Sequence, residues 1–232
     1  MRSVFCDERT WPRRRLARLA LGAALTGLAP RRGSAQPGSF ILQTPSGPVE
    51  MRYGDAPGER AVAFVGGAGG GFDSPARDLY GRLAAALPGE GIASLRLRFR
   101  RPTDLEASVA DLSAGVAELE RRGKTRIGLI GHSFGGPVVI HAAAAARSVR
   151  AVIALATQSY GAQPVQTLGP RCSVLLIHGT ADRVLPPEVS RTVYEMAAEP
   201  KRLVLIDGAG HGLQEASEEV EQLVRAWLAI YL

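Results

Sequence analysis

The feature that most constrains the fold is an alternation, after residue 36, of short apolar runs with longer segments of helical periodicity. Six runs rich in Val, Ile, Leu and Ala are predicted to be strands: residues 61–65, 92–99, 126–130, 151–156, 173–177 and 202–206. Most are continuously apolar, which is typical of parallel strands buried on both faces. Because parallel strands need crossover connections, the helical segments between them complete the pattern. The sequence therefore predicts an α/β fold with helices on both faces of a mostly parallel sheet.

Two further strands are predicted ahead of the parallel series, at residues 40–44 and 49–53. The intervening Pro45-Ser46-Gly47-Pro48 is a turn short enough to make them an antiparallel pair. The strand at 92–99 departs from the continuous apolar pattern, because Arg residues alternate with apolar ones from residue 95 to 100. One side of that strand's end is therefore expected to be polar or to face solvent.

Helix start signals and one-sided apolar faces support this interpretation. Thr103-Asp104-Leu105-Glu106 has the sequence of a capping box. Ser74-Pro75 combines a potential N-cap with a Pro at the first helical position. The last helix carries apolar residues on one face, at Val220, Leu223, Val224, Trp227 and Tyr231. These helices are expected to cover the sheet, with Trp227 in the core.

Residues 1–35 have the organisation of a targeting segment. Arg13-Arg14-Arg15 precedes an apolar stretch at 19–29, and Gly33-Ser34-Ala35 places small residues at positions −3 and −1 of a cleavage site. The Arg run also resembles a twin-arginine export signal. Eleven apolar or small residues fall short of the roughly 20 that span a bilayer. We expect cleavage after Ala35, which leaves a mature domain at 36–232. This domain is expected to lie in the periplasm or outside the cell and not to insert stably in membranes. The alternative is that residues 1–35 stay attached as an uncleaved anchor.

The charge distribution argues against a nucleic-acid partner. The chain has 28 basic and 22 acidic residues, a formal net charge of +6. Eight Arg and two acids, Asp7 and Glu8, lie within residues 1–35, which leaves 20 basic and 20 acidic residues in the remainder. The predicted domain therefore has no net positive charge with which to hold a phosphate backbone.

The strongest chemical signal is Gly131-His132-Ser133-Phe134-Gly135, a G-x-S-x-G placed between a predicted strand and a helix. A sharp strand-to-helix turn needs small neighbours, because a Cβ at Gly131 or Gly135 would crowd the adjoining elements. Ser133 would then project above the sheet as a nucleophile. A serine hydroxyl is a poor nucleophile near neutral pH, so a base is required.

Four histidines could act as that base. His132 adjoins the nucleophile and is expected to point elsewhere, and His141 lies within the following helix. His178 lies at the end of a strand, where a histidine more often supports the following loop than acts as a catalytic base. His211 lies in a glycine-flanked loop after the last strand, at the same sheet edge as the nucleophile. The order Ser, Asp, His along the chain favours His211.

A carboxylate should orient the base and stabilise its protonated form. Asp182 follows the penultimate strand, 49 residues after Ser133 and 29 before His211, and so has the expected order and sheet edge. Asp207, at the end of the last strand, is the alternative carboxylate. The structural explanation for an Asp at that position is that it caps the turn.

Acyl transfer also needs donors for the oxyanion. The backbone N–H of Phe134 is one candidate. The second is expected from the glycine-rich segment 66–71, where we select Ala68. A phosphate-binding role for this segment is disfavoured, because G-x-G-x-x-G fails at Phe72 and no Gly-Lys-Ser/Thr follows. No Cys or His spacing suits zinc, so neither a metal nor a cofactor is expected.

Together these motifs resemble the α/β-hydrolase superfamily from about residue 40 onward. The glycine segment leading to Asp73-Ser74-Pro75, the Gly131–Gly136 turn and His178-Gly179-Thr180-Ala181-Asp182 are similar to small, lidless members near the dienelactone-hydrolase branch. The resemblance implies an eight-stranded, mostly parallel sheet, no cap domain and a Ser-His-Asp triad. Dienelactone hydrolases use a Cys nucleophile, whereas this chain has Ser133, so their specific chemistry is not carried over.

These features predict a serine hydrolase that cleaves small carboxylic esters or thioesters through an acyl-Ser133 intermediate. In this fold a cap is usually inserted where the chain has only residues 157–172, so short acyl groups are expected to be preferred. A peptidase is one alternative. A catalytically silent binding module of the same fold is another, because fold alone does not imply activity.

Overall fold

The computed structural model describes residues 4–6 and 38–232. Its strands form one sheet in the order β1-β9-β8-β7-β6-β4-β5-β3-β2. The strand bounds are β1 Val4–Cys6, β2 Gly38–Thr44, β3 Gly47–Gly54, β4 Arg60–Val65, β5 Ala93–Leu97, β6 Arg126–His132, β7 Val149–Leu155, β8 Ser173–Gly179 and β9 Lys201–Ile206. All eight predicted strands are present as β2 to β9.

The predicted eight-stranded sheet is confirmed by β2 to β9, and a ninth short strand is added to it. The extra strand, β1, pairs antiparallel with β9 at one edge of the sheet. It comes from the segment predicted to be a signal peptide, most of which lies outside the described residues. The unpaired edge of β9 provides the backbone donors and acceptors with which β1 bonds.

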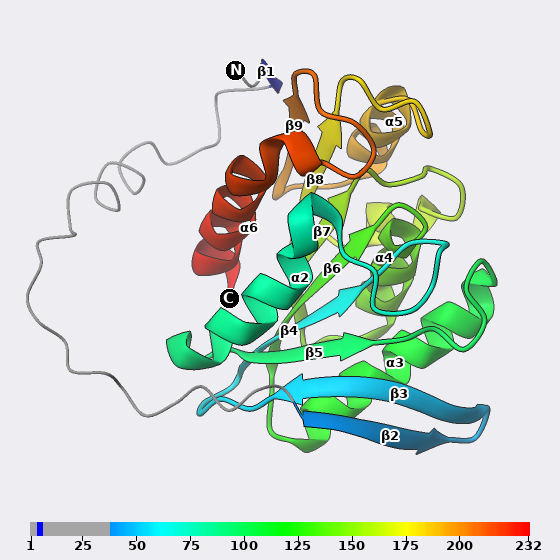
Figure 1. Cartoon of the computed structure of the whole chain (residues 1–232), viewed down its shortest axis with the longest axis vertical. Helices are drawn as coiled ribbons and strands as arrows, with labels where there is room; N and C mark the ends of the chain where they lie inside the picture. Colours follow the sequence, from blue (N-terminus) through cyan, green and yellow to red (C-terminus); the bar gives the residue numbers. More distant parts are fainter. Residues whose placement is uncertain (1–3, 7–37) are drawn as a thin grey trace, which may run out of the picture.

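The sheet is mostly parallel, as predicted. Strands β4 to β9 pair in parallel with one another, while β3 pairs antiparallel with both β2 and β5. The loops that follow β4, β6, β7, β8 and β9 therefore gather at one edge of the sheet (Figure 1). This edge is where ligands bind in open α/β sheets.

Helices cover both faces of the sheet. The bounds are α2 Pro75–Ala86, α3 Leu105–Arg121, α4 Gly135–Ala145, α5 Glu188–Met196 and α6 Ser217–Tyr231, with short 3-10 helices η1 Leu87–Glu90, η2 Gln163–Thr167 and η3 Gln214–Ala216. Helices α2 and α6 lie on one face, and α3, α4 and α5 lie on the other (Figure 1).

Each face of the sheet has its own apolar core. The larger one contains an apolar face of α3, with Leu112, Val116 and Leu119 buried. The other joins α2 and α6 to the sheet. Trp227 of α6 lies in this second core, and its Nε1 donates to Ser173 Oγ at 3.0 Å. The expectation that Trp227 is a core residue is confirmed.

Two local predictions differ from the structure in their details. Helix α3 is capped by Asp104 rather than Thr103: the Asp104 side chain accepts from the Ala107 N–H at 3.0 Å. An Asp at the N-cap accepts a hydrogen bond from an amide of the first helical turn. The observed N-cap therefore lies one residue after Thr103, the N-cap of the predicted capping box. Strand β5 ends at Leu97, and the exposed Arg98 lies just beyond it.

No cap domain covers the loop edge within residues 38–232. Residues 156–172, between β7 and β8, contain η2 as their one helical element. This confirms the expected absence of a cap. None of the helices in the described part of the chain is long and apolar enough to cross a membrane.

Candidate active site

Ser133 occupies the sharp turn between β6 and α4. Its φ of 54° lies in the left-handed region, which non-glycine residues rarely adopt. The turn is fixed on both sides, because the Ser133 N–H donates to the Leu155 carbonyl at 2.9 Å and its own carbonyl accepts from Gly136 N–H at 3.0 Å. Backbone strain of this kind is characteristic of functional sites. The turn holds Ser133 at the loop edge of the sheet, as the G-x-S-x-G pattern predicts.

The two flanking glycines are required by close backbone approaches. A Cβ at Gly131 would lie 2.2 Å from the Gly135 carbonyl oxygen, and one at Gly135 would lie 2.5 Å from the Gly66 carbonyl oxygen. Both distances are far below van der Waals contact, and the opposing atoms are backbone. The predicted crowding of the turn is therefore confirmed, and it also draws the turn against the segment after β4.

Asp182 and His211 meet at the same edge, from the loops after β8 and β9. Asp182 Oδ2 accepts from His211 Nδ1 at 2.7 Å. The Asp182 side chain is fully buried, whereas that of His211 is 20% exposed. A histidine that donates from Nδ1 to a carboxylate leaves Nε2 unprotonated and able to accept a proton. This pair has the geometry of a base oriented by an acid.

The Asp182 carboxylate is held ionised despite its burial. Burial raises its pKa, but hydrogen bonds from the Leu185 N–H, His211 and the Val184 N–H lower it, and the net pKa lies below the ordinary value. The two backbone bonds, to Oδ1, measure 3.0 and 2.8 Å. Charge-assisted bonds of this kind are stronger than neutral ones.

Asp207 does not contact the base. Its Oδ1 accepts from Thr180 Oγ1 at 3.2 Å, and it stays exposed at the turn after β9. The structure thus brings Asp182, and not Asp207, to His211. Among the other histidines, His178 donates to Asp182, as a loop-supporting residue would, and His141 Nε2 bonds to the Gly161 carbonyl at 2.9 Å.

His132 does not point away from the site, contrary to the prediction. Its Nε2 donates to the backbone carbonyl of His211 at 2.9 Å, and the two rings lie 4.8 Å apart between centroids. Burial lowers the pKa of His132 to about 4. The ring therefore remains neutral and fixes the loop that carries His211. The one sequence signal for this role was the adjacency of His132 to Ser133.

The predicted oxyanion donors lie on two segments that border the turn. Phe134 immediately precedes α4, where backbone N–H groups have no partner within a helix. Ala68 lies exposed in the loop after β4, which a Gly70 N–H bond to the Gly67 carbonyl closes at 3.3 Å. A Cβ at Gly67 would lie 3.4 Å from the Ser133 Cβ, so this loop packs directly against the nucleophile turn.

A hollow of about 500 Å³ opens beside this loop. It lies between the β2–β3 turn and the segment after β5, and its walls include Gly69, Gly70, Glu50, Arg98 and Pro102. Arg98 and Glu50 form an exposed ion pair of 3.4 Å in it. Its lining combines the apolar Pro48, Phe99 and Pro102 with glycine backbone and charged side chains, and Ser133, Asp182 and His211 do not line it.

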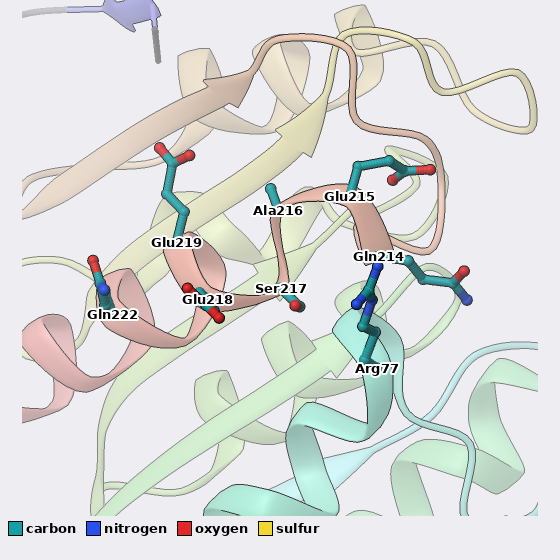
Figure 2. Close-up of a pocket in the computed structure, with 8 residues that line it drawn as sticks. All are labelled: Arg77, Gln214, Glu215, Ala216, Ser217, Glu218, Glu219 and Gln222. Carbon is teal, nitrogen blue, oxygen red and sulfur yellow. The ribbon is translucent and has the colours of Figure 1, made fainter. Parts of the chain in front are cut away.

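A second hollow, of about 390 Å³, lies behind the loop of His211 (Figure 2). Arg77 of α2 faces acidic residues from η3 and the start of α6 across it. Glu215, in its wall, accepts from the Gly210 N–H at 3.2 Å, and the Ala76 N–H donates to the Gly212 carbonyl at 2.7 Å. These two bonds hold the His211 loop from outside. Neither Ser133, Asp182 nor His211 lines this hollow.

No group of three or more His, Cys, Asp or Glu that could hold a metal ion occurs among the described residues. The arrangement at the loop edge instead offers a strained serine, a base with an ionised acid behind it, and backbone amides nearby. Those are the groups that acyl transfer needs.

Stability should fall as pH is lowered from 6.5 to about 4, because His132 takes up a proton in the unfolded chain from about 6.5 downward but in the folded chain only near 4. The loss should be at most about 3 kcal/mol from this residue. Urea unfolding across this range would measure it. His132→Gln keeps a donor for the His211 carbonyl but cannot titrate, so its stability should vary less with pH. Equal pH dependence in both proteins would contradict the assignment.

Several solved structures share this architecture. The dienelactone hydrolase of Anabaena variabilis superposes with a TM-score of 0.71 at 22% identity, covering 85% of this chain and 100% of that one. Est1E of Butyrivibrio proteoclasticus gives 0.66 at 19% identity, covering 83% and 99%. An alpha-beta serine hydrolase homologue of Coxiella burnetii gives 0.66 at 22%, covering 82% and 96%. At these identities the likeness shows the α/β-hydrolase fold.

Sequence comparison gives a more specific relationship. The protein YfhR of Escherichia coli K12 is 53% identical over 38 residues, a match that spans 16% of this chain and only 13% of YfhR. The sequence model of the dienelactone hydrolase family matches residues 68–229, which include the glycine loop after β4, the Ser133 turn and the loops of Asp182 and His211. This match extends over most of the chain, which therefore belongs to the dienelactone hydrolase family.

Proposed function

We propose that this protein is a serine hydrolase that cleaves carboxylic esters or thioesters through an acyl-Ser133 intermediate. The observation that carries the proposal is the 2.7 Å bond between buried Asp182 and His211 at the sheet edge where the strained Ser133 turn lies. The family supports hydrolysis in general. The choice of Ser133, His211 and Asp182 as nucleophile, base and acid is our assignment from the local chemistry.

In the first half-reaction, His211 Nε2 accepts the Ser133 hydroxyl proton as Oγ bonds to the substrate carbonyl carbon. The tetrahedral intermediate then collapses, its bond to the leaving oxygen or sulfur breaks, and His211 returns the proton to that atom. In the second half-reaction, water gives a proton to His211 while its oxygen attacks the acyl carbon. Oγ departs with the proton from His211, and the free acid is released.

Backbone amides are proposed to stabilise the negative oxygen of each intermediate. The Phe134 N–H and the Ala68 N–H are the two donors, from the nucleophile turn and the neighbouring glycine loop. Loss of one such donor typically costs about 2.7–4 kcal/mol of transition-state stabilisation. The close packing of Gly67 on Ser133 supports the placement of the second donor.

Two alternatives are less well supported. A silent binding module has no need of an ionised, buried carboxylate bonded to a histidine at the edge of the sheet. A peptidase would need to engage an extended chain, and residues 38–232 hold no additional domain to gate or select one. The experiments below separate a silent binding module from an enzyme with an activated serine.

The expected substrates have short acyl groups. No cap covers the site within the described chain, so no additional element is available there to enclose a long acyl chain. Phe72 and Tyr160 are two aromatic residues that could form walls of a substrate site. The Phe72 ring is in contact with guanidinium groups, with that of Arg52 3.9 Å and that of Arg96 5.7 Å from its centroid. Tyr160 is 80% exposed in the loop after β7 and is the better candidate to contact a substrate.

We also propose export to the periplasm or outside the cell, on the sequence of residues 1–35 alone. Cleavage after Ala35 would remove β1, the three-residue strand on the edge of β9. The remaining eight strands would retain the parallel sheet and every residue assigned a role here.

Replacing Ser133 or His211 by Ala should each lower ester turnover by on the order of 10⁴-fold, with no further large loss in the double variant, because the two act as one unit. A nitrophenyl ester assay measures this, and labelling by a fluorophosphonate should disappear in Ser133→Ala. Asp207→Asn is the matched control for Asp182→Asn, because it removes a carboxylate that does not contact His211. Wild-type turnover by Ser133→Ala would refute the mechanism.

The preference for acyl length should be visible in kcat/KM for nitrophenyl esters from acetate to dodecanoate. Burial of one CH₂ group contributes about 0.8 kcal/mol, and a CH₂ group that stays in water contributes none of it. The value of kcat/KM should therefore not rise with chain length beyond short acyl groups. Tyr160→Ala should reduce kcat/KM for the preferred ester if Tyr160 contacts it. A steady rise toward dodecanoate, or activation at a lipid interface, would reveal a long-chain groove and contradict this proposal.

If the twin-arginine route is used, changing Arg13 and Arg14 to Lys should block export, since that signal depends on the Arg pair. N-terminal sequencing of the exported wild-type protein should begin at Gln36. Arg31 and Arg32, changed to Lys, are the matched control and should leave export intact. Intact Met1 chains in the membrane fraction would instead indicate an uncleaved anchor.

A further inference from the structure

The acid behind the base is shared by a second histidine. His178, at the end of β8, has its Nε2 3.0 Å from Asp182 Oδ2, the same oxygen that accepts from His211. On the other side of the ring, Nδ1 lies 2.6 Å from Ser190 Oγ on α5. The side chains of His178 and Asp182 are both fully buried, and Ser190 is buried as well. A continuous chain of hydrogen bonds thus runs from α5 to the base.

The partners determine which nitrogen of His178 carries the proton. Nε2 faces the Asp182 carboxylate and the Leu185 carbonyl, each at 3.0 Å, and both can only accept. Nε2 must therefore be protonated. Nδ1 of the neutral ring is then an acceptor, and the Ser190 hydroxyl donates to it. Burial lowers the pKa of His178, which is consistent with a neutral ring.

The same contacts fill the hydrogen-bonding capacity of Asp182. Oδ1 accepts from the Val184 and Leu185 N–H groups, and Oδ2 accepts from His211 and His178. A carboxylate has about four acceptor positions, so all are occupied. Three of the four donors hold the carboxylate in place, and the fourth is the base. Without His178, one buried lone pair of Oδ2 would be empty and the oxygen could turn away from His211.

We propose that His178 is a positioning residue for catalysis, which holds Asp182 Oδ2 on the His211 Nδ1–H and is itself held by Ser190. This inference rests on the proposed function, because it assigns His211 as the base. His178 does not contact the substrate in this scheme. Its loss should therefore slow the chemical step and leave substrate binding unchanged.

The test compares His178→Leu, which removes the donor, with His178→Gln, whose side-chain amide can still donate to Oδ2. His178→Leu should lower kcat by on the order of 10- to 100-fold, as expected for a small misplacement of a catalytic group, with KM within about twofold of wild type. His178→Gln should recover most of the loss. Asp207→Asn, which removes an exposed carboxylate bonded to Thr180 and not to His211, is the control and should keep wild-type kinetics.

A spectroscopic measurement on the wild-type protein does not depend on any variant folding. In ¹⁵N NMR of histidine-labelled protein, His178 should show a protonated Nε2 and an unprotonated Nδ1. Ser190→Ala should change the Nδ1 signal, because its hydrogen bond is lost. A protonated Nδ1 in the wild type would overturn the proposal, as would a folded His178→Leu with wild-type kcat or a folded His178→Gln as slow as His178→Leu.

Failure of the proposed function would look different. In that case the wild type would neither turn over esters nor react with a fluorophosphonate at Ser133. The NMR measurement would then still decide whether His178 donates to Asp182. If the wild type is active and only the His178 variants behave unexpectedly, the positioning role alone is wrong.

Discussion

A buried carboxylate is the constraint around which this edge of the sheet is organised. An ionised group without partners is very costly to bury, so Asp182 requires donors on every side. The two N–H groups of the Val184-Leu185 turn, His178 and His211 supply them. Three of these donors come from β8 and the loop after it, and the fourth, His211, comes from the loop after β9. Satisfying Asp182 therefore fixes the loops after both strands relative to each other.

The Ser133 turn depends on a second constraint, which is that the backbones of β6, α4 and the segment after β4 approach one another closely. Ser133 adopts a left-handed conformation because Gly131 and Gly135 allow β6, α4 and the segment after β4 to meet without side chains between them. His132, next to Ser133, then reaches the His211 carbonyl. The Ser133 turn and the Asp182–His211 pair are thereby joined through the half-buried imidazole of His132. Both apolar cores support this edge, since each anchors some of the strands whose loops form it.

Neither the fold nor the family specifies the reaction, so the proposed chemistry depends on the contacts around Ser133, Asp182 and His211. A scaffold of this kind hosts many reactions, so membership of the dienelactone hydrolase family establishes the architecture and a hydrolytic character. Two features of this chain bear on its proposed substrates: Ser133 in its strained turn, and a loop edge that no cap covers within the described residues. We propose that together they favour esters with short acyl groups.

The sequence by itself determined the strand and helix order, the loop edge and the candidates Ser133 and His211, with Asp182 or Asp207 as the carboxylate, because periodicity, glycine spacing and chain order are local signals. Only the tertiary structure decided that Asp182 rather than Asp207 reaches His211, that His132 contacts the loop of His211, and that His178 shares the Asp182 carboxylate. It also placed β1 on β9. These outcomes join residues from 4 to 201 positions apart. The hydrogen bonds between them depend on strand order and loop conformation, which no local pattern encodes.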